Sequence, residues 1–127
     1  MGRVILIVED DPKNTKLLRD LLKLGGYATL EASDGKQGVD MARAKMPDLV
    51  FMDIQMPVMD GFEAIRILKT DPATTGIPVV AVTALAMQGD REKCLEAVFD
   101  DYISKPLDTR AFVMKVKEYL EKQGRNP

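Results

Sequence analysis

The chain has 127 residues, with 18 Lys and Arg against 20 Asp and Glu, no histidine and one cysteine. This length suits a single domain over residues 1–127, and the nearly balanced charge gives no electrostatic basis for binding nucleic acid or an anionic membrane. The absence of histidine excludes Ser-His-Asp and Cys-His catalysis and argues strongly against a zinc site.

Two further features indicate a soluble, cytoplasmic protein. No apolar run approaches the ~20 residues that cross a bilayer, and Met1 leads into the first strand pattern without a signal peptide. The single cysteine, Cys94, excludes an internal disulfide and suits a reducing compartment.

The first strand is predicted over residues 4–8, VILIV, because an unbroken aliphatic run of this length is typical of a strand covered on both faces. Pro12 then follows at a first-turn position behind a capping aspartate. Leucines recur at helical spacing until residues 25–26, a Gly-Gly pair that ends this first helix.

Residues 27–32 alternate polar and apolar side chains, which predicts a half-exposed strand toward the edge of the sheet. Ser33 or Asp34 can cap a second helix, which Pro47 ends. The predicted apolar face of this helix includes Val39, Ala42 and Met46.

A third strand is predicted over the apolar run of residues 49–53, and Asp60-Gly61 then turns the chain into a third helix, closed by Asp71-Pro72. Residues 77–84, IPVVAVTA, predict a fourth strand as apolar as the first. The apolar face of the third helix comprises Phe62, Ile65 and Leu68.

The C-terminal part predicts a mostly polar helix over residues 88–97, a short strand over residues 102–104 and a last helix capped by Asp108. The apolar face of the last helix comprises Phe112, Val113, Val116 and Leu120. Five strands alternating with five helices predict an α/β fold, a parallel sheet with right-handed crossovers that is covered by helices on both faces.

In such a sheet, ligands bind beyond the carboxyl ends of the strands. Polar residues follow the predicted strands at that edge, namely Glu9, Asp10, Asp53, Thr83 and Lys105. Three crowded carboxylates repel one another unless a cation intervenes, and an all-oxygen set favours Mg²⁺. With a metal in place, Asp53 could act as a nucleophile toward phosphorus, with Lys105 and Thr83 stabilising the charge on the phosphoryl oxygens.

Four motifs, in this order, resemble the receiver domain of two-component response regulators. They are VEDD at residues 8–11, MDIQMPVMDG at 52–61, VTA at 82–84 and DDYISKP at 100–106. Overall the sequence is most similar to single-domain, stand-alone receivers of the chemotaxis and cell-division type. The resemblance implies a three-layer, flavodoxin-like (βα)5 fold, doubly wound, with five parallel strands in the order 2-1-3-4-5.

The resemblance also implies a role for individual residues. Asp53 is expected to be phosphorylated, Thr83 and Lys105 to contact the phosphoryl group, and Tyr102 to act as an aromatic switch that responds to Thr83. A cis peptide bond is expected at Lys105-Pro106. The implied Mg²⁺ ligands, for which Mn²⁺ could substitute, are Asp10 directly, Glu9 through water, Asp53, and the backbone carbonyl of Gln55.

The sequence departs from the family pattern at two positions. Val98 stands where the family usually has glycine. This departure could change the turn before the fifth strand, and with it the orientation of Tyr102. Asp11 adds a third acid beside the usual pair, and we expect it to cap the first helix rather than to bind the metal.

The resemblance implies a signalling switch that accepts a phosphoryl group from a histidine kinase or a histidine phosphotransfer protein. It would catalyse only its own phosphorylation and autodephosphorylation, and would signal by protein binding through the fourth helix, fifth strand and fifth helix. A phosphorylation-independent protein-binding scaffold is the alternative. An aspartyl-phosphate hydrolase is disfavoured because Gln55 stands where such enzymes carry a second acid, and a flavoprotein because acids replace a phosphate-binding loop.

Overall fold

The computed structural model describes residues 3–54, 56, 58–83, 99–104 and 108–124, with the backbone alone at Thr83, Ser104 and residues 122–124. Five parallel strands form one sheet in the order β2-β1-β3-β4-β5, as the resemblance implied. The strands are β1 (Val4–Val8), β2 (Ala28–Ala32), β3 (Leu49–Asp53), β4 (Val79–Thr83) and β5 (Asp101–Ser104).

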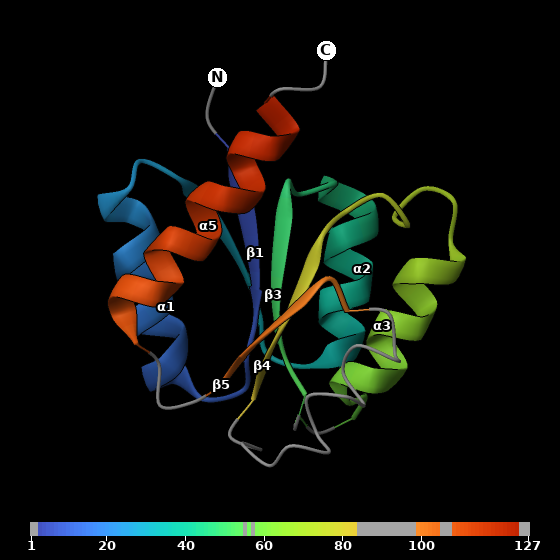
Figure 1. Cartoon of the computed structure of the whole chain (residues 1–127). Coiled ribbons are helices and arrows are strands. Elements are labelled where there is room, and N and C mark those ends of the chain that lie inside the picture. The colour runs from blue at the N-terminus through green and yellow to red at the C-terminus, as the bar shows by residue number, and fades with distance from the viewer. Residues whose placement is uncertain (1–2, 55, 57, 84–98, 105–107, 125–127) are drawn as a thin grey trace.

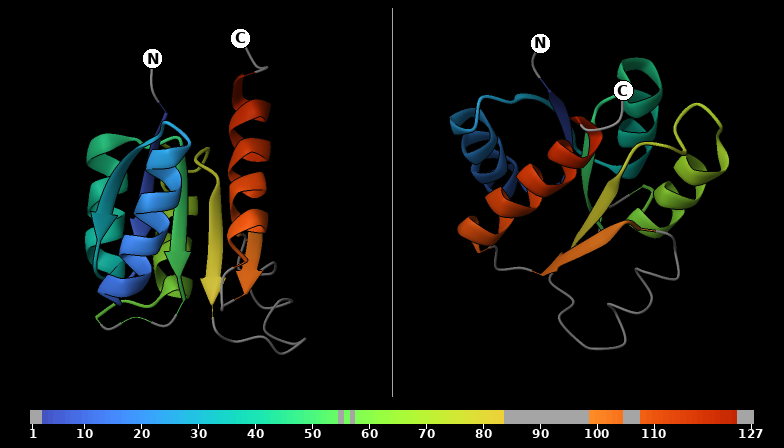
Figure 2. Two further views of the ribbon diagram at one scale, coloured as in Figure 1. Left: turned by 90° about the vertical axis from the view of Figure 1, so that its left-hand side faces the viewer. Right: turned by 45° about the horizontal axis from the view of Figure 1, so that its top comes forward.

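Helices cover both faces of this sheet (Figures 1 and 2). One face carries α1 and α5, and the opposite face carries α2 and α3. The helices are α1 (Pro12–Leu24), α2 (Gly35–Lys45), α3 (Gly61–Thr70) and α5 (Thr109–Gly124). The helix predicted over residues 88–97 lies outside the described residues. The α/β prediction with three layers is confirmed for the elements that the structure describes.

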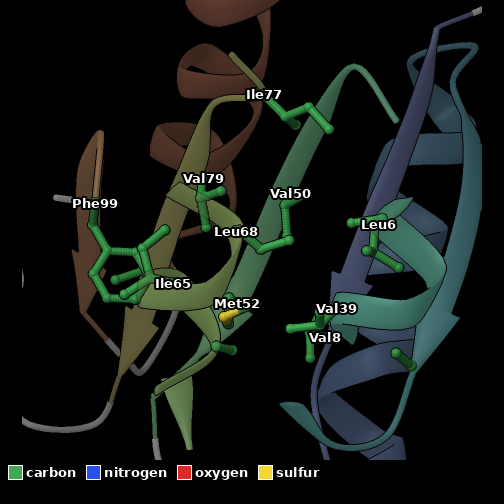
Figure 3. Close-up of a cluster of buried hydrophobic side chains, with 14 of the residues drawn as sticks. Leu6, Val8, Val39, Val50, Met52, Ile65, Leu68, Ile77, Val79 and Phe99 are labelled. Carbon is green, nitrogen blue, oxygen red and sulfur yellow. The ribbon is translucent and has the colours of Figure 1, made fainter. Parts of the chain in front are cut away.

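Alternating side chains of the central strands build two cores. In β1, Leu6 and Val8 point to the α2–α3 face, whereas Ile5 and Ile7 point to the α1–α5 face. Figure 3 shows the first of these cores, in which the strand residues meet Val39 from α2 and Ile65 and Leu68 from α3. Because β1 and β3 are buried on both faces, their sequences are continuous apolar runs, as predicted.

The second core is closed by an aromatic pair. Phe51 of β3 and Phe112 of α5 are both buried, and their ring centroids lie 4.6 Å apart. This contact packs α5 against β3, the middle strand, and in Figure 1 α5 passes in front of the upper end of β1. By contrast, β2 is half-exposed at the sheet edge, as its alternating sequence predicted.

Aspartates begin all the described helices. Asp11, Asp34 and Asp60 each accept a hydrogen bond from a backbone N–H of the first turn, at 2.8–2.9 Å. Asp108 does the same for α5, at 3.0 Å from Arg110 N–H. Because the first three caps follow β1, β2 and β3, they fix the start of each helix at the carboxyl edge of the sheet.

One predicted core residue is placed differently. Met46 does not belong to the buried face of α2, because the helix ends at Lys45 and Met46 adopts a left-handed conformation with φ of 48°. Its side chain is 50% exposed, whereas Val39 and Ala42 are buried as predicted. The left-handed helix end therefore turns Met46 away from the core.

The described helices were also compared with the length and composition of membrane-spanning helices. None of those in the described ranges combines the length and the apolar composition that a membrane-spanning helix needs.

Candidate functional site

The pairing of β1 with β3 brings two acids side by side at the carboxyl edge of the sheet. Val8 lies opposite Met52 in the parallel register, so the next residues, Glu9 and Asp53, lie side by side at the ends of their strands. Glu9 N–H donates to the Ala32 carbonyl at 3.0 Å, which keeps its backbone aligned with β2. The central position of β1 and β3 therefore sets where these two carboxylates lie.

Glu9, Asp10 and Asp53 form one cluster. Each offers a carboxylate oxygen, and these oxygens all lie within 4.8 Å of one another. Glu9 is 3% exposed and Asp53 is 5% exposed, whereas Asp10 is exposed to solvent. Three carboxylates at this spacing form an all-oxygen set of the kind that hard divalent cations prefer.

Asp11 has a different role from these three acids. Its carboxylate accepts from Lys13 N–H at 2.9 Å and caps α1, while its own N–H donates to the Glu9 carboxylate at 3.1 Å. The expectation that Asp11 serves as a helix cap is confirmed. The backbone at Asp11 thus also positions Glu9.

Two glycines hold the loop between β3 and α3 close to Asp53. Gly61 N–H donates to the Ile54 carbonyl at 2.8 Å, and a Cβ at Gly61 would lie 2.8 Å from the Asp53 carbonyl oxygen. Gly35 N–H donates to the Met59 carbonyl at 3.1 Å, and a Cβ at Gly35 would lie 2.2 Å from that oxygen. Only a residue without Cβ permits these backbone approaches.

The contact between Gly35 and Met59 was not foreseen from the sequence. It joins the start of α2 to a loop 24 positions later in the chain, and neither residue carries a local signal for such a pairing. For Gly61 the sequence predicted the turn into α3, but not the close approach of its backbone to Asp53.

A cleft of about 480 Å³ opens beside the acids, between α1 and the ends of β1 and β2. Glu9 and Asp10 line it on the side of the site, and Arg19 and Glu31 on the other. Arg19 and Glu31 are joined at 2.8 and 3.1 Å, and the hydrogen bond and charge of Glu31 raise the pKa of the guanidinium. The cleft therefore exposes one side of the acid cluster to solvent beside a pre-formed ion pair.

The other predicted site residues are described only in part. The backbone of Thr83 ends β4 at the same edge, opposite Ser104, but the Thr83 side chain is outside the described part. Tyr102 is half-buried and packs against the α2–α3 core. Gln55, and Lys105 with its bond to Pro106, lie outside the described residues, as does Val98.

Comparisons with known proteins agree with this geometry. The chain matches the model of the response regulator receiver domain over residues 5–117. It is 43% identical over 120 residues to the polar-differentiation response regulator DivK of Brucella anthropi. That match covers 94% of this chain and 98% of the DivK protein. The DivK protein of Brucella ovis is matched to the same extent.

Solved structures show the same fold. The receiver domain of the sensor histidine kinase PA1611 from Pseudomonas aeruginosa, with a magnesium ion coordinated in its active-site cleft, is 35% identical with a TM-score of 0.88. That likeness covers 95% of this chain and 99% of the other. A CheY-like receiver domain protein from Methanospirillum hungatei is 28% identical with a TM-score of 0.90, covering 100% of both chains.

The family match extends from the first strand into the last helix and includes the acid cluster. The chain therefore belongs to the response regulator receiver domains, which take part in phosphorelay signalling.

Proposed function

We propose that Asp53 is the residue on which this receiver accepts a phosphoryl group. The observation that carries the proposal is the convergence of the Asp53 carboxylate with those of Glu9 and Asp10, within 4.8 Å, at the carboxyl edge of a parallel sheet. Of the three, Asp53 lies on the strand whose following loop is clamped by Gly61 and Gly35. The backbone that carries the Asp53 carboxylate is therefore held in place, which favours positioning of a nucleophile.

The donor set suits Mg²⁺, and we propose that Glu9, Asp10 and Asp53 hold it. Mg²⁺ prefers oxygen ligands, retains several waters, and is usually bound by one or two carboxylates together with phosphate oxygens. When bound, it would neutralise the crowded carboxylates and the charge on the phosphoryl oxygens. The magnesium ion in the cleft of the PA1611 receiver supports this assignment, and we expect Mn²⁺ to substitute.

The phosphoryl donor must come from outside the chain, which has no histidine. In the proposed transfer, an Asp53 carboxylate oxygen forms a bond to phosphorus while the bond between phosphorus and a donor imidazole nitrogen breaks. The bonding electron pair goes to that nitrogen, and because the other ring nitrogen of the phosphorylated imidazole carries a proton, the leaving group is neutral imidazole. A sensor histidine kinase or a histidine phosphotransfer protein is the class of partner that supplies this group.

Three further assignments belong to the same proposal. Lys105 and Thr83 would stabilise the phosphoryl oxygens, and the Gln55 carbonyl would be a further metal ligand. Tyr102 would act as the aromatic switch that responds to Thr83 on phosphorylation, because its ring packs on the α2–α3 core while its backbone lies in β5. These roles follow from the family motif at those positions.

The output is proposed to be protein binding through the face of the fourth helix, β5 and α5, from a single domain over residues 1–127. The chain would then act as an enzyme only on itself, in phosphorylation and autodephosphorylation, and in the cytoplasm, where its donors are found. A scaffold that binds independently of phosphorylation is the competing function. Equal partner affinity with and without a phosphate mimic would favour the scaffold.

Intact-mass measurement tests the proposal directly. The purified chain is incubated with phosphoramidate and Mg²⁺, and we expect a gain of one phosphoryl group that a chelator abolishes. Asp53→Asn should show no gain, while Asp40→Asn, which removes an exposed acid of α2 paired with Lys36, should behave as wild type. The proposal fails if Asp53→Asn gains the group as wild type does.

A further inference from the structure

Val58 combines two features that are unfavourable for an isolated folded chain. Its φ is 69°, in the left-handed region that a β-branched residue rarely adopts, and its side chain is 79% exposed. Among the described non-glycine residues only Met46 also has a positive φ, and Met46 ends a helix, where that conformation is common. Val58 lies outside the described helices, so no helix end accounts for its conformation.

The loop around Val58 holds this side chain outward. Met56 and Met59, on either side of it, are half-buried and pack against the α2–α3 core. The base of the loop is closed by the hydrogen bond from Gly61 to Ile54. Among the described residues of this loop, Val58 thus presents its apolar side chain to solvent between Met56 and Met59, which are anchored on the core.

Folding alone gives no reason for valine at this position. Glycine adopts a positive φ without strain, and asparagine tolerates it far better than a β-branched residue. Either would also remove an exposed apolar group. A valine here is explained if its methyl groups are covered by another molecule.

The position of the loop indicates which molecule that is, and this step rests on the proposed function. In the proposed transfer the donor imidazole belongs to another protein, and because Asp53 is only 5% exposed, the surface of that protein must come against the residues around the site. Val58 is three residues from Gly61, whose backbone packs against the Asp53 carbonyl, and three residues span at most about 11 Å when fully extended. A typical interface of about 800 Å² per partner has a radius of roughly 16 Å, so one centred on Asp53 would include Val58.

We propose that Val58 is an apolar contact for the phosphohistidine-bearing donor protein and a determinant of transfer from that protein. It is not a catalytic residue, because it does not need to touch the phosphoryl group. It should therefore affect transfer from a protein donor and leave transfer from a small donor unchanged.

The test compares two donors that share the same phosphorus–nitrogen bond. One is phosphoramidate, which has no protein surface, and the other is a histidine phosphotransfer protein, phosphorylated on its histidine, from which the wild-type chain accepts. The variants are Val58→Gly and Val58→Asn, both compatible with the backbone, and Val58→Ile, which keeps an apolar side chain. Met46→Asn is the matched control, since Met46 is also exposed with a positive φ but follows α2 at the opposite edge of the sheet.

Val58→Gly and Val58→Asn should lower kcat/KM with the protein donor by about tenfold, as expected for loss of a significant apolar contact. Their phosphoramidate rates should stay within about twofold of wild type, the range of ordinary context effects, as should both rates of Val58→Ile and Met46→Asn. Unchanged transfer from the protein donor would overturn the inference, and so would an equal loss with both donors. Absence of wild-type labelling by phosphoramidate would instead refute the proposed function, and the inference with it.

Discussion

Adjacent acidic residues lie at both edges of the sheet, but they make different contacts at the two edges. At the amino edge, Asp100 and Asp101 lie at the start of β5, and each is paired with a lysine of this chain. At the carboxyl edge, Glu9 and Asp10 converge with Asp53. Acids paired with the chain's own cations join elements together, whereas the acids that converge on one another offer the oxygen ligands that we propose for a cation from solution.

At the amino edge, Asp100 connects three elements. Its carboxylate accepts from Val79 N–H at 2.7 Å and from Lys69 Nζ at 3.1 Å, and Lys69 also donates to the Ile77 carbonyl at 2.8 Å. Lys69 is only 13% exposed at its side chain. This network ties the end of α3 to the starts of β4 and β5.

Asp101 ties β5 to α5 in the same way. Its carboxylate accepts from Lys115 Nζ at 2.6 Å and from the Tyr119 hydroxyl at 3.3 Å. Burial alone would raise the pKa of Asp101, but the hydrogen bonds from Lys115 and from Tyr102 N–H outweigh it and hold the pKa below its ordinary value. Burial, together with the charge of Asp101, raises the pKa of Tyr119.

The largest expected effect of a single substitution is on metal binding at the carboxyl edge. Asp10→Asn removes one of the three converging carboxylates, and we expect it to weaken Mg²⁺ binding by about 100-fold, or about 2.7 kcal/mol. Isothermal titration calorimetry measures this directly. Asp100→Asn, at the amino edge, should leave the affinity unchanged, and a comparable loss in that variant would break the distinction between the two edges.

The second effect is on stability at the amino edge. Lys69→Met keeps most of the side-chain volume but removes a largely buried cation from the exposed Asp100 carboxylate and from the Ile77 carbonyl. We expect the free energy of unfolding to fall by about 1–3 kcal/mol, measured by urea denaturation. Mg²⁺ affinity should be the same as in wild type, and a stability equal to wild type would contradict the structural role of this pair.

The third effect is a change in acid sensitivity. Because the folded pKa of Asp101 lies below its ordinary value of 3.8, its contribution to stability is present above that value and is lost as the pH falls through the folded pKa. Asp101→Asn should therefore flatten the decline of the unfolding free energy below about pH 4. Since the group is partly exposed, we expect a contribution below about 1 kcal/mol, and an unaltered pH profile would argue against this pairing.

The smallest effect is expected at exposed helical pairs, which serve as controls for both edges. Lys36→Met removes a cation that pairs with Asp40 one turn away, at 3.0 Å and largely in solvent. The expected loss is about 0.3–0.5 kcal/mol by urea denaturation. A loss as large as that of Lys69→Met would mean that burial does not set the difference between these pairs.

The structural features that depend on local sequence pattern could be predicted from the sequence. Buried strands are continuous apolar runs, so β1 and β3 could be located, and the acids that follow them could be assigned to one edge. The caps at Asp11 and Asp108 were likewise visible from residue type and position, whereas Asp34 was predicted only as an alternative to Ser33 and Asp60 only as part of a turn. The strand order depended on the family resemblance, because local pattern does not specify which strands are neighbours.

Other features depend on contacts between distant segments or on backbone conformation. The ion pair of Lys69 with Asp100 spans 31 positions, and the motif that contains Asp100 and Asp101 gave no indication that these acids are structural. Met46 was assigned to the core because helical spacing alone does not reveal where a helix ends. The positive φ of Val58 has no signature in the residue type, which disfavours it.

The central claim is that the acids of the carboxyl edge serve one phosphoryl-accepting carboxylate, Asp53. Borohydride reduces an acyl phosphate of aspartate to homoserine, so treatment of the phosphorylated chain followed by peptide sequencing in the mass spectrometer identifies the modified position. The account predicts homoserine at position 53 in the presence of Mg²⁺ and none after chelation. Homoserine at position 9, 10 or any other acid instead of 53 would contradict it.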